Sequence, residues 1–210
     1  FVSIEYLEEK KVNKANYYIS SAFFVLTIMS SIIFLFVSIC SEQIGMFLNI
    51  ENFDRQSRLF LIISVSSFLI TSLVSVFIVA PSIKEKFYLS DFALVISRLI
   101  QLLFIIIFIF IFDNFNILNY GYSLLISSLL YLTISIFISK SLIPEFQINL
   151  KYVSVRHTRK LLRMGYKVVL NNLGILLYTN TDIFIISIYL GIAYVADFAL
   201  SLQLAIFISL

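Results

Sequence analysis

The chain has 210 residues, of which 60% are hydrophobic and 13% are charged, and its formal net charge is +3. Soluble domains carry roughly 25% charged residues, so this composition and a mean hydropathy of +1.01 exclude a water-soluble fold. Nucleic-acid binding is not expected either, because the basic residues flank apolar segments instead of forming a basic patch on a soluble surface.

Apolar segments recur along the chain at about the 20 residues that one helix needs to cross a bilayer. A spanning β-strand would alternate in polarity, whereas Leu102–Phe112 is apolar at every position. The sequence therefore predicts an all-α integral membrane protein, a polytopic helix bundle with about six transmembrane helices in this chain. The expected spans are Tyr17–Cys40, Leu59–Ile83, Phe92–Phe112, Phe115–Ser139, Val168–Leu190 and a sixth that starts near Val195 and is cut at Leu210.

Basic residues are concentrated in alternate connections. Only Arg55 and Arg58, of the 15 lysines and arginines, fall outside the segment before the first span, the turn into the third span and the connection before the fifth. The positive-inside rule sets orientation from this bias. We therefore expect a cytoplasmic N-terminus, external segments at residues 41–57 and 113–119, and a cytoplasmic connection at residues 140–163.

This connection is the longest in the chain, and it predicts the boundary between two lobes. Residues 1–140, with four transmembrane helices, would belong to an N-terminal lobe, and residues 164–210 would begin a C-terminal lobe with two helices, the second truncated. Residues 141–163 would be a basic cytoplasmic linker. It could lie flat on the inner leaflet through Phe146, Leu150 and Val153, or it could be solvated and serve only to fix topology. Both ends of the sequence look cut.

Asp182 is the most informative polar residue, because an ionisable group inside a span is costly and usually faces a bundle interior or an aqueous cavity. Asn171, Tyr178 and Tyr189 fall on nearly the same helix face as Asp182, and Lys167 lies near the expected cytoplasmic end of that stripe. The stripe could line a hydrophilic path for a polar head group. Alternatively, it could be a buried network that holds helices together.

Arg98 is expected about six residues into the third span, with Gln101 one turn further on the same side. Its guanidinium could reach the lipid head groups by snorkelling, or it could contact a phosphate or a sugar. Small hydroxyl residues that favour close helix packing, or could line a cavity, also repeat at helical spacing in three spans. They are Ser20, Thr27, Ser31 and Ser38; Ser64, Thr71, Ser75 and Ser82; and Ser128, Ser135 and Ser139.

No pattern of catalytic residues is visible. The sequence contains one cysteine, Cys40, and one histidine, His157, so neither a disulfide framework nor a metal cluster is predicted. Serines within the spans lack the partnering base that nucleophilic catalysis requires, and phosphate-loop and paired-carboxylate motifs are missing. We therefore expect no catalytic residues, no metal, no cofactor and no enzymatic activity.

The stretch LLRMGYKVVLNNLGILLYTNTDIFIISIYLGIAYVADFALSL, at residues 161–202, resembles the polysaccharide and O-antigen flippases of the multidrug/oligosaccharidyl-lipid/polysaccharide exporter superfamily. The resemblance rests on a Gly that opens a span, an Asp before a run of aliphatic residues, a second Gly and a small-aromatic pair. The matching positions are Gly165, Asp182, Gly191, and Ala196 with Phe198. Gly and Tyr are commoner at the last two positions, and the Pro that often follows the first Gly is missing.

This resemblance implies a bacterial inner-membrane, multi-pass protein of 12–14 helices in two lobes, of which this chain would supply roughly the third to the eighth helix. It also implies a flippase that moves an undecaprenyl-diphosphate-linked oligosaccharide for O-antigen, lipopolysaccharide, capsule or exopolysaccharide assembly. The implied partners are that lipid-linked oligosaccharide and membrane lipids, and a coupling cation at Asp182 stays open. The alternatives are a drug or metabolite exporter or another lipid-linked precursor flippase of the same superfamily, and a membrane polysaccharide polymerase.

Overall fold

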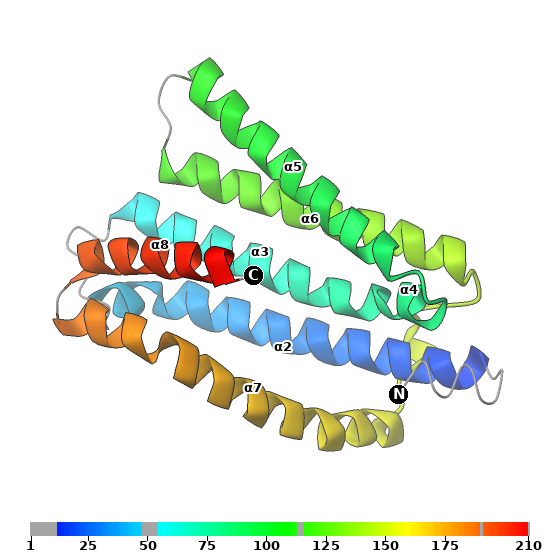
Figure 1. Ribbon diagram of the computed structural model, residues 1–210. Helices are drawn as coiled ribbons and strands as arrows, with labels where there is room; N and C mark the ends of the chain where they lie inside the picture. Colours follow the sequence, from blue (N-terminus) through cyan, green and yellow to red (C-terminus); the bar gives the residue numbers. More distant parts are fainter. Residues whose placement is uncertain (1–11, 48–53, 113–115, 190, 210) are drawn as a thin grey trace.

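The computed structural model describes residues 12–47, 54–112, 116–189 and 191–209 (Figure 1). These residues form helices and, within the described ranges, no strands, which confirms the all-α membrane prediction. The elements are α2 (Val12–Phe47), α3 (Arg55–Phe77), α4 (Val79–Ile83), α5 (Phe87–Phe112), α6 (Ile117–Leu142), the 3-10 turn η1 (Leu150–Tyr152), α7 (Val155–Tyr189) and α8 (Ile192–Ser209).

The long helices run up and down in one bundle, with α3 at its centre (Figure 1). Helix α3 packs against α2 on one side and α6 on the other, α5 packs against α6, and α7 packs against both α2 and α8. The connections α4–α5 and α6–α7 and the start of α2 all meet at one end of the bundle. We call it the basic end, after Lys84, Lys86, Lys140, Lys151, Arg156, Arg159 and Lys160.

Four segments within the described residues are long and apolar enough to cross a membrane: Ala15–Ile44, Arg55–Ile83, Phe87–Phe110 and Ile117–Leu142. Helices α7 and α8 are not among them, so the expected count of six is not confirmed. Helix α7 also begins at Val155, well before the predicted start of the fifth span at Val168, because the basic segment ahead of that span is itself helical.

The end of α3 is set by a proline. Pro81 has no N–H to donate, and its ring clashes with the carbonyl four residues earlier in a continuous helix. That carbonyl belongs to Phe77, the last residue of α3, and the chain continues as α4 after Ile78. At its other end α3 is capped by Asp54, whose carboxylate accepts a hydrogen bond from the Ser57 N–H at 2.8 Å. This bond holds the pKa of Asp54 below its ordinary value.

Helix α6 buries its polar face. Small residues at a helix interface in a membrane let backbones approach closely, and the buried side chains of α6 recur at four-residue spacing on the side that packs against its neighbours. They are Ser123, Ser127, Tyr131, Ser135 and Ser139, together with Gly121 and Ser128. The Ser128 and Ser67 hydroxyls are 3.2 Å apart and join α6 to α3 by a buried hydrogen bond.

Gly121 lies where α6 packs tightly against α3. A β-carbon at this position would lie 3.1 Å from Phe60 Cδ2 and 3.4 Å from Ile63 Cγ2, whereas carbon atoms prefer about 3.5–4.0 Å. We expect Gly121→Leu to destabilise the bundle by about 1–3 kcal/mol through overpacking, and to lower the melting temperature in detergent. Gly165→Leu is the matched control, because a β-carbon at Gly165 would meet nothing within 4 Å. Equal melting temperatures for the two variants would contradict this packing.

Candidate functional site

A hydroxyl-lined cavity lies between α3, α5 and α6. Its volume is about 220 Å³, below the roughly 300–1,000 Å³ of ordinary ligand pockets, so it has room for several waters, a phosphate or part of a sugar. An aqueous cavity needs polar partners for its waters, and this lining supplies them. The lining residues are Ser64, Ser67, Phe68 and Thr71 of α3, Leu94, Ser97 and Arg98 of α5, and Leu124, Ser127, Ser128 and Tyr131 of α6.

Arg98 lies near the middle of its helix. Because α5 begins at Phe87 and not at Phe92, Arg98 is eleven residues into the candidate span and twelve from its end at Phe110. Eleven residues are about 16 Å of helix, and both expectations for Arg98, snorkelling to the head groups and contact with a phosphate or a sugar, stay predictions. Arg98 is one of the cavity-lining residues and is exposed. Its guanidinium donates to Gln101 Oε1 at 2.8 Å, and Gln101 is 7% exposed.

The serine series expected from the sequence divide between packing and cavity lining. Ser64 and Thr71 line the cavity, and Ser128 both lines it and bridges to α3. Thr27 and Ser31 do not line it, and their hydroxyls bond to carbonyl groups of their own helix, as those of Thr71 and Ser128 also do. Sequence reasoning missed four polar residues of the lining, and the four-residue repeat of α6 could have revealed two of them. The four are Ser67, Ser97, Ser127 and Tyr131.

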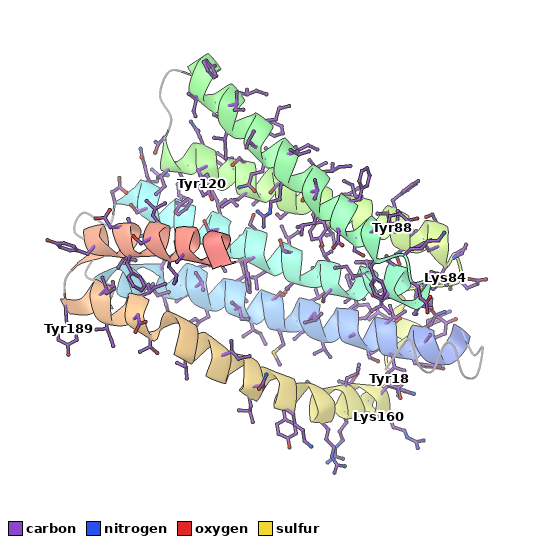
Figure 2. The ribbon with its side chains drawn as sticks, in the orientation of Figure 1. Tyr18, Lys84, Tyr88, Tyr120, Lys160 and Tyr189 are labelled. Carbon is purple, nitrogen blue, oxygen red and sulfur yellow. The ribbon has the colours of Figure 1, made fainter. Side chains whose placement is uncertain are left out.

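The expected stripe on α7 lies away from this cavity. Asn171, Asp182, Tyr189 and Lys167 all have exposed side chains, and the side chain of Tyr178 lies outside the described residues. Figure 2 shows Tyr189 at the far end of α7, pointing away from the bundle. The structure therefore brings Arg98 and Gln101 together at the cavity, and it places the described members of the stripe on an open face of α7.

A second polar arrangement joins the start of α2 to the segment after α6. The Asn16 side chain donates to the Glu145 carbonyl at 3.0 Å and accepts from the Gln147 N–H at 3.1 Å. One turn later, the Ser20 hydroxyl donates to the Gln147 carbonyl at 3.1 Å and accepts from the Asn149 N–H at 3.2 Å. We call this set the linker clamp; Asn16 and Ser20 are 3% and 0% exposed.

The linker clamp is possible because one turn of α-helix and two residues of extended chain rise by nearly the same length. Four residues of α-helix rise about 6 Å, and two residues of extended chain rise about 6.6 Å. Asn16 and Ser20 therefore reach alternate residues of an extended segment that lies along α2, namely Gln147 and Asn149. Ser21 adds a third point of attachment, because its hydroxyl accepts from the Ser154 N–H at 3.3 Å.

Aromatic side chains continue this attachment onto α7. His157 stacks on Tyr17 with ring centroids 5.3 Å apart and meets Tyr18 edge-on at 4.7 Å. Lys160 Nζ donates to the Tyr18 hydroxyl at 3.2 Å, and these two residues meet at the basic end in Figure 2. The first two turns of α7 are thus fixed to α2 by side chains that the sequence had not singled out as partners.

The clamp makes a testable prediction about linker exposure. Asn16→Ala leaves the Glu145 carbonyl and the Gln147 N–H without their partner, and a buried unsatisfied group costs about 1–3 kcal/mol. We expect tryptic cleavage after Lys151 to accelerate about fivefold or more. Asn116→Ala is the matched control, because it removes a single exposed bond to Gln56 at the opposite end. Equal cleavage in both variants would show that Asn16 does not hold the linker.

Metal ligation has no support in the described part of the chain, where no group of three or more His, Cys, Asp or Glu side chains could hold an ion. Cys40 is a free thiol. The chemistry available at the cavity is instead hydrogen bonding by hydroxyl groups and one guanidinium. Such groups can solvate sugar hydroxyls or phosphate oxygens without breaking bonds.

Comparison with known proteins identifies the family to which the chain belongs. Residues 6–209 match the family described as "Polysaccharide biosynthesis protein". The chain is also similar to the "Uncharacterized membrane protein EpsK" of Bacillus subtilis (strain 168), with 24% identity over 191 residues, which are 90% of this chain and 38% of that protein. No solved structure matches. The chain thus spans less than two thirds of the length of this curated relative. With its family match over nearly the whole chain and its apolar helices, the chain belongs to the polysaccharide biosynthesis protein family of multi-pass membrane proteins.

Proposed function

We propose that the chain is part of a flippase that moves an undecaprenyl-diphosphate-linked oligosaccharide across the bacterial inner membrane. The observation that carries this proposal is Arg98, in the middle of a candidate span and beside a hydroxyl-lined cavity, in a member of a polysaccharide biosynthesis family. Charged residues at such depth usually mark a substrate or ion pathway. An arginine also suits phosphate, because its planar fork matches phosphate oxygens.

Moving a saccharide across a membrane requires a polar path through the bundle. Polar groups lose their hydrogen bonds to water when they enter hydrocarbon, at a cost of about 2–7 kcal/mol for each uncompensated group. A saccharide carries many hydroxyl groups, so its head needs hydrogen-bonding partners throughout its passage, whereas its lipid tail can stay in the bilayer. In this proposal Arg98, Gln101 and the cavity hydroxyls supply one part of that polar path.

The exposed stripe of α7 supplies a second part. Asn171, Asp182 and Tyr189 would face the remaining helices of the full-length protein across a central cavity, with Tyr178 among them and Lys167 near the basic end. The basic end would lie on the cytoplasmic side, as the positive-inside rule expects. Asp182, seven residues from the opposite end of α7 at Tyr189, would act through its charge, either on the substrate or on a coupling cation.

Deleting the gene tests this function directly. We expect the lipid-linked repeat unit to be assembled normally and to accumulate on the inner leaflet, with loss of surface polysaccharide, because only its translocation would be blocked. The measurement is the leaflet distribution of the lipid-linked oligosaccharide, with the wild-type gene restored as control. An unchanged leaflet distribution would contradict a flippase. Single repeat units exported and attached at the surface would instead identify a polymerase.

A further inference from the structure

A larger cavity, of about 710 Å³, lies at the basic end of the bundle between α2, α3, α6 and the linker. Its origin is visible in the packing. Helix α3 contacts both α2 and α6, but α2 and α6 do not contact each other in the described residues. The two outer helices therefore enclose a wedge whose floor is α3. The clamped linker crosses from the end of α6 to α2 and closes this wedge at the basic end (Figure 1).

The lining of the cavity is amphiphilic. The helices supply an apolar wall, and the linker supplies both apolar and polar side chains beside the cation of Lys140. The apolar lining consists of Ile19 and Phe23 of α2, Val76 and Phe77 of α3, Ile136 of α6, and Pro144, Phe146 and Ile148 of the linker; the polar lining consists of Ser139, Lys140, Gln147 and Asn149. A ligand that matches this lining needs a long apolar part and a polar head.

The charge of that head follows from the surroundings. Among the described residues, Lys140 is exposed and is the one charged residue in the lining; Lys86 and Lys151 lie exposed at the same end of the bundle, and so does the acidic Glu85. The nearest acidic residue along the linker, Glu145, is exposed and does not line the cavity. The charge that the described lining offers is therefore a cation, and it favours an anionic head group.

We propose that this cavity binds a lipid phosphate, with the phosphate group at Lys140 and the first carbons of its chain against Phe23, Phe77 and Phe146. The cavity volume falls within the range of ordinary ligand pockets. A free phosphate would leave the apolar wall unfilled. The rest of a long chain could pass into the bilayer between α2 and α6, since no described helix other than α3 contacts both.

The position of the cavity supports a membrane ligand. The candidate spans of α3 and α6 end at Ile83 and Leu142, close in sequence to the cavity residues Phe77 and Lys140. Lipid phosphates lie at this boundary between hydrocarbon and water, where a lysine can keep its charge in water while its stem covers apolar surface. The cavity would thus hold a lipid at the depth that its phosphate occupies in a leaflet.

Photolabelling of the full-length protein in nanodiscs tests the site. The probes are photoreactive phosphatidylglycerol and photoreactive polyprenyl diphosphate, with diacylglycerol and polyprenol analogues as uncharged controls. We expect both phosphate probes to label peptides that contain Phe23, Phe77 or Phe146, at least fivefold more strongly than the alcohols. Lys140→Gln should remove most of this difference. Lys86→Gln also removes one positive charge, but outside the cavity, and it should leave the labelling difference unchanged.

Each outcome decides the proposal. Equal labelling by phosphates and alcohols, labelling elsewhere, or an equal loss in Lys140→Gln and Lys86→Gln would overturn it. Similar labelling by both phosphate probes would support a general lipid-phosphate site. Stronger labelling by polyprenyl diphosphate would support a site for the carrier lipid of the proposed substrate. Because labelling requires no translocation, its failure is distinguishable from a failure of the proposed function.

Discussion

Arg98→Gln is expected to reduce translocation of the lipid-linked oligosaccharide about tenfold or more. A hydrogen bond to a charged group contributes roughly 1.5–3 kcal/mol, and Gln cannot replace the charged guanidinium of Arg98, one of the residues that line the hydroxyl-lined cavity. Arg98→Lys keeps the charge but loses the planar fork, so its translocation should lie between those of Arg98→Gln and the wild type. The measurement is leaflet transfer of the substrate at matched protein levels in the membrane.

Arg55→Gln is the control for Arg98, because Arg55 is also an exposed arginine but lies at the start of α3 and does not line the cavity. It should translocate normally. If Arg98→Gln also translocates normally, the guanidinium contributes only to packing with Gln101. The proposed polar path would then have to avoid this cavity.

Asp182→Asn is expected to abolish translocation while leaving the abundance of the protein near normal. The substitution keeps the shape of the side chain and removes its charge. If Asp182 only linked helices by hydrogen bonds, Asn would largely substitute, because such contacts average about 0.6 kcal/mol in measured membrane proteins. Asp182→Ala should match the Asn variant if charge is essential. Translocation by both variants is to be measured at matched membrane levels.

Asp197→Asn is the control for this prediction. Asp197 is also an exposed aspartate, but it is the sixth residue of α8 and lies outside the stripe on α7. Its charge should be dispensable. Near-normal translocation by Asp182→Asn would show that the charge of Asp182 is dispensable too.

The helices could be predicted from the sequence because apolar blocks of spanning length leave few alternatives. Their ends could not. Hydropathy reports which residues prefer lipid and not which residues are helical, so it missed the first five residues of α5, among them Tyr88 and Asp91. For the same reason it missed the basic start of α7 at Val155. The earlier start of α5 places Arg98 near the middle of that helix.

The site was predictable only in part. Spacing along one helix placed Arg98 beside Gln101, and the two side chains form a hydrogen bond. It could not show which faces of three helices meet around a cavity. The linker clamp could not be predicted from the sequence. Asn16 and Glu145 are 129 residues apart, and the linker contributes backbone groups that no residue type reveals.

The linker clamp also limits how this chain can vary in length. Surface connections usually accept insertions and deletions, but here alternate residues must meet successive turns of α2. One added or removed residue between Glu145 and Asn149 would turn the bonded backbone groups away from Asn16 and Ser20. The segment after α6 is therefore a spacer of fixed length, and among relatives we expect its side chains to change more freely than its number of residues.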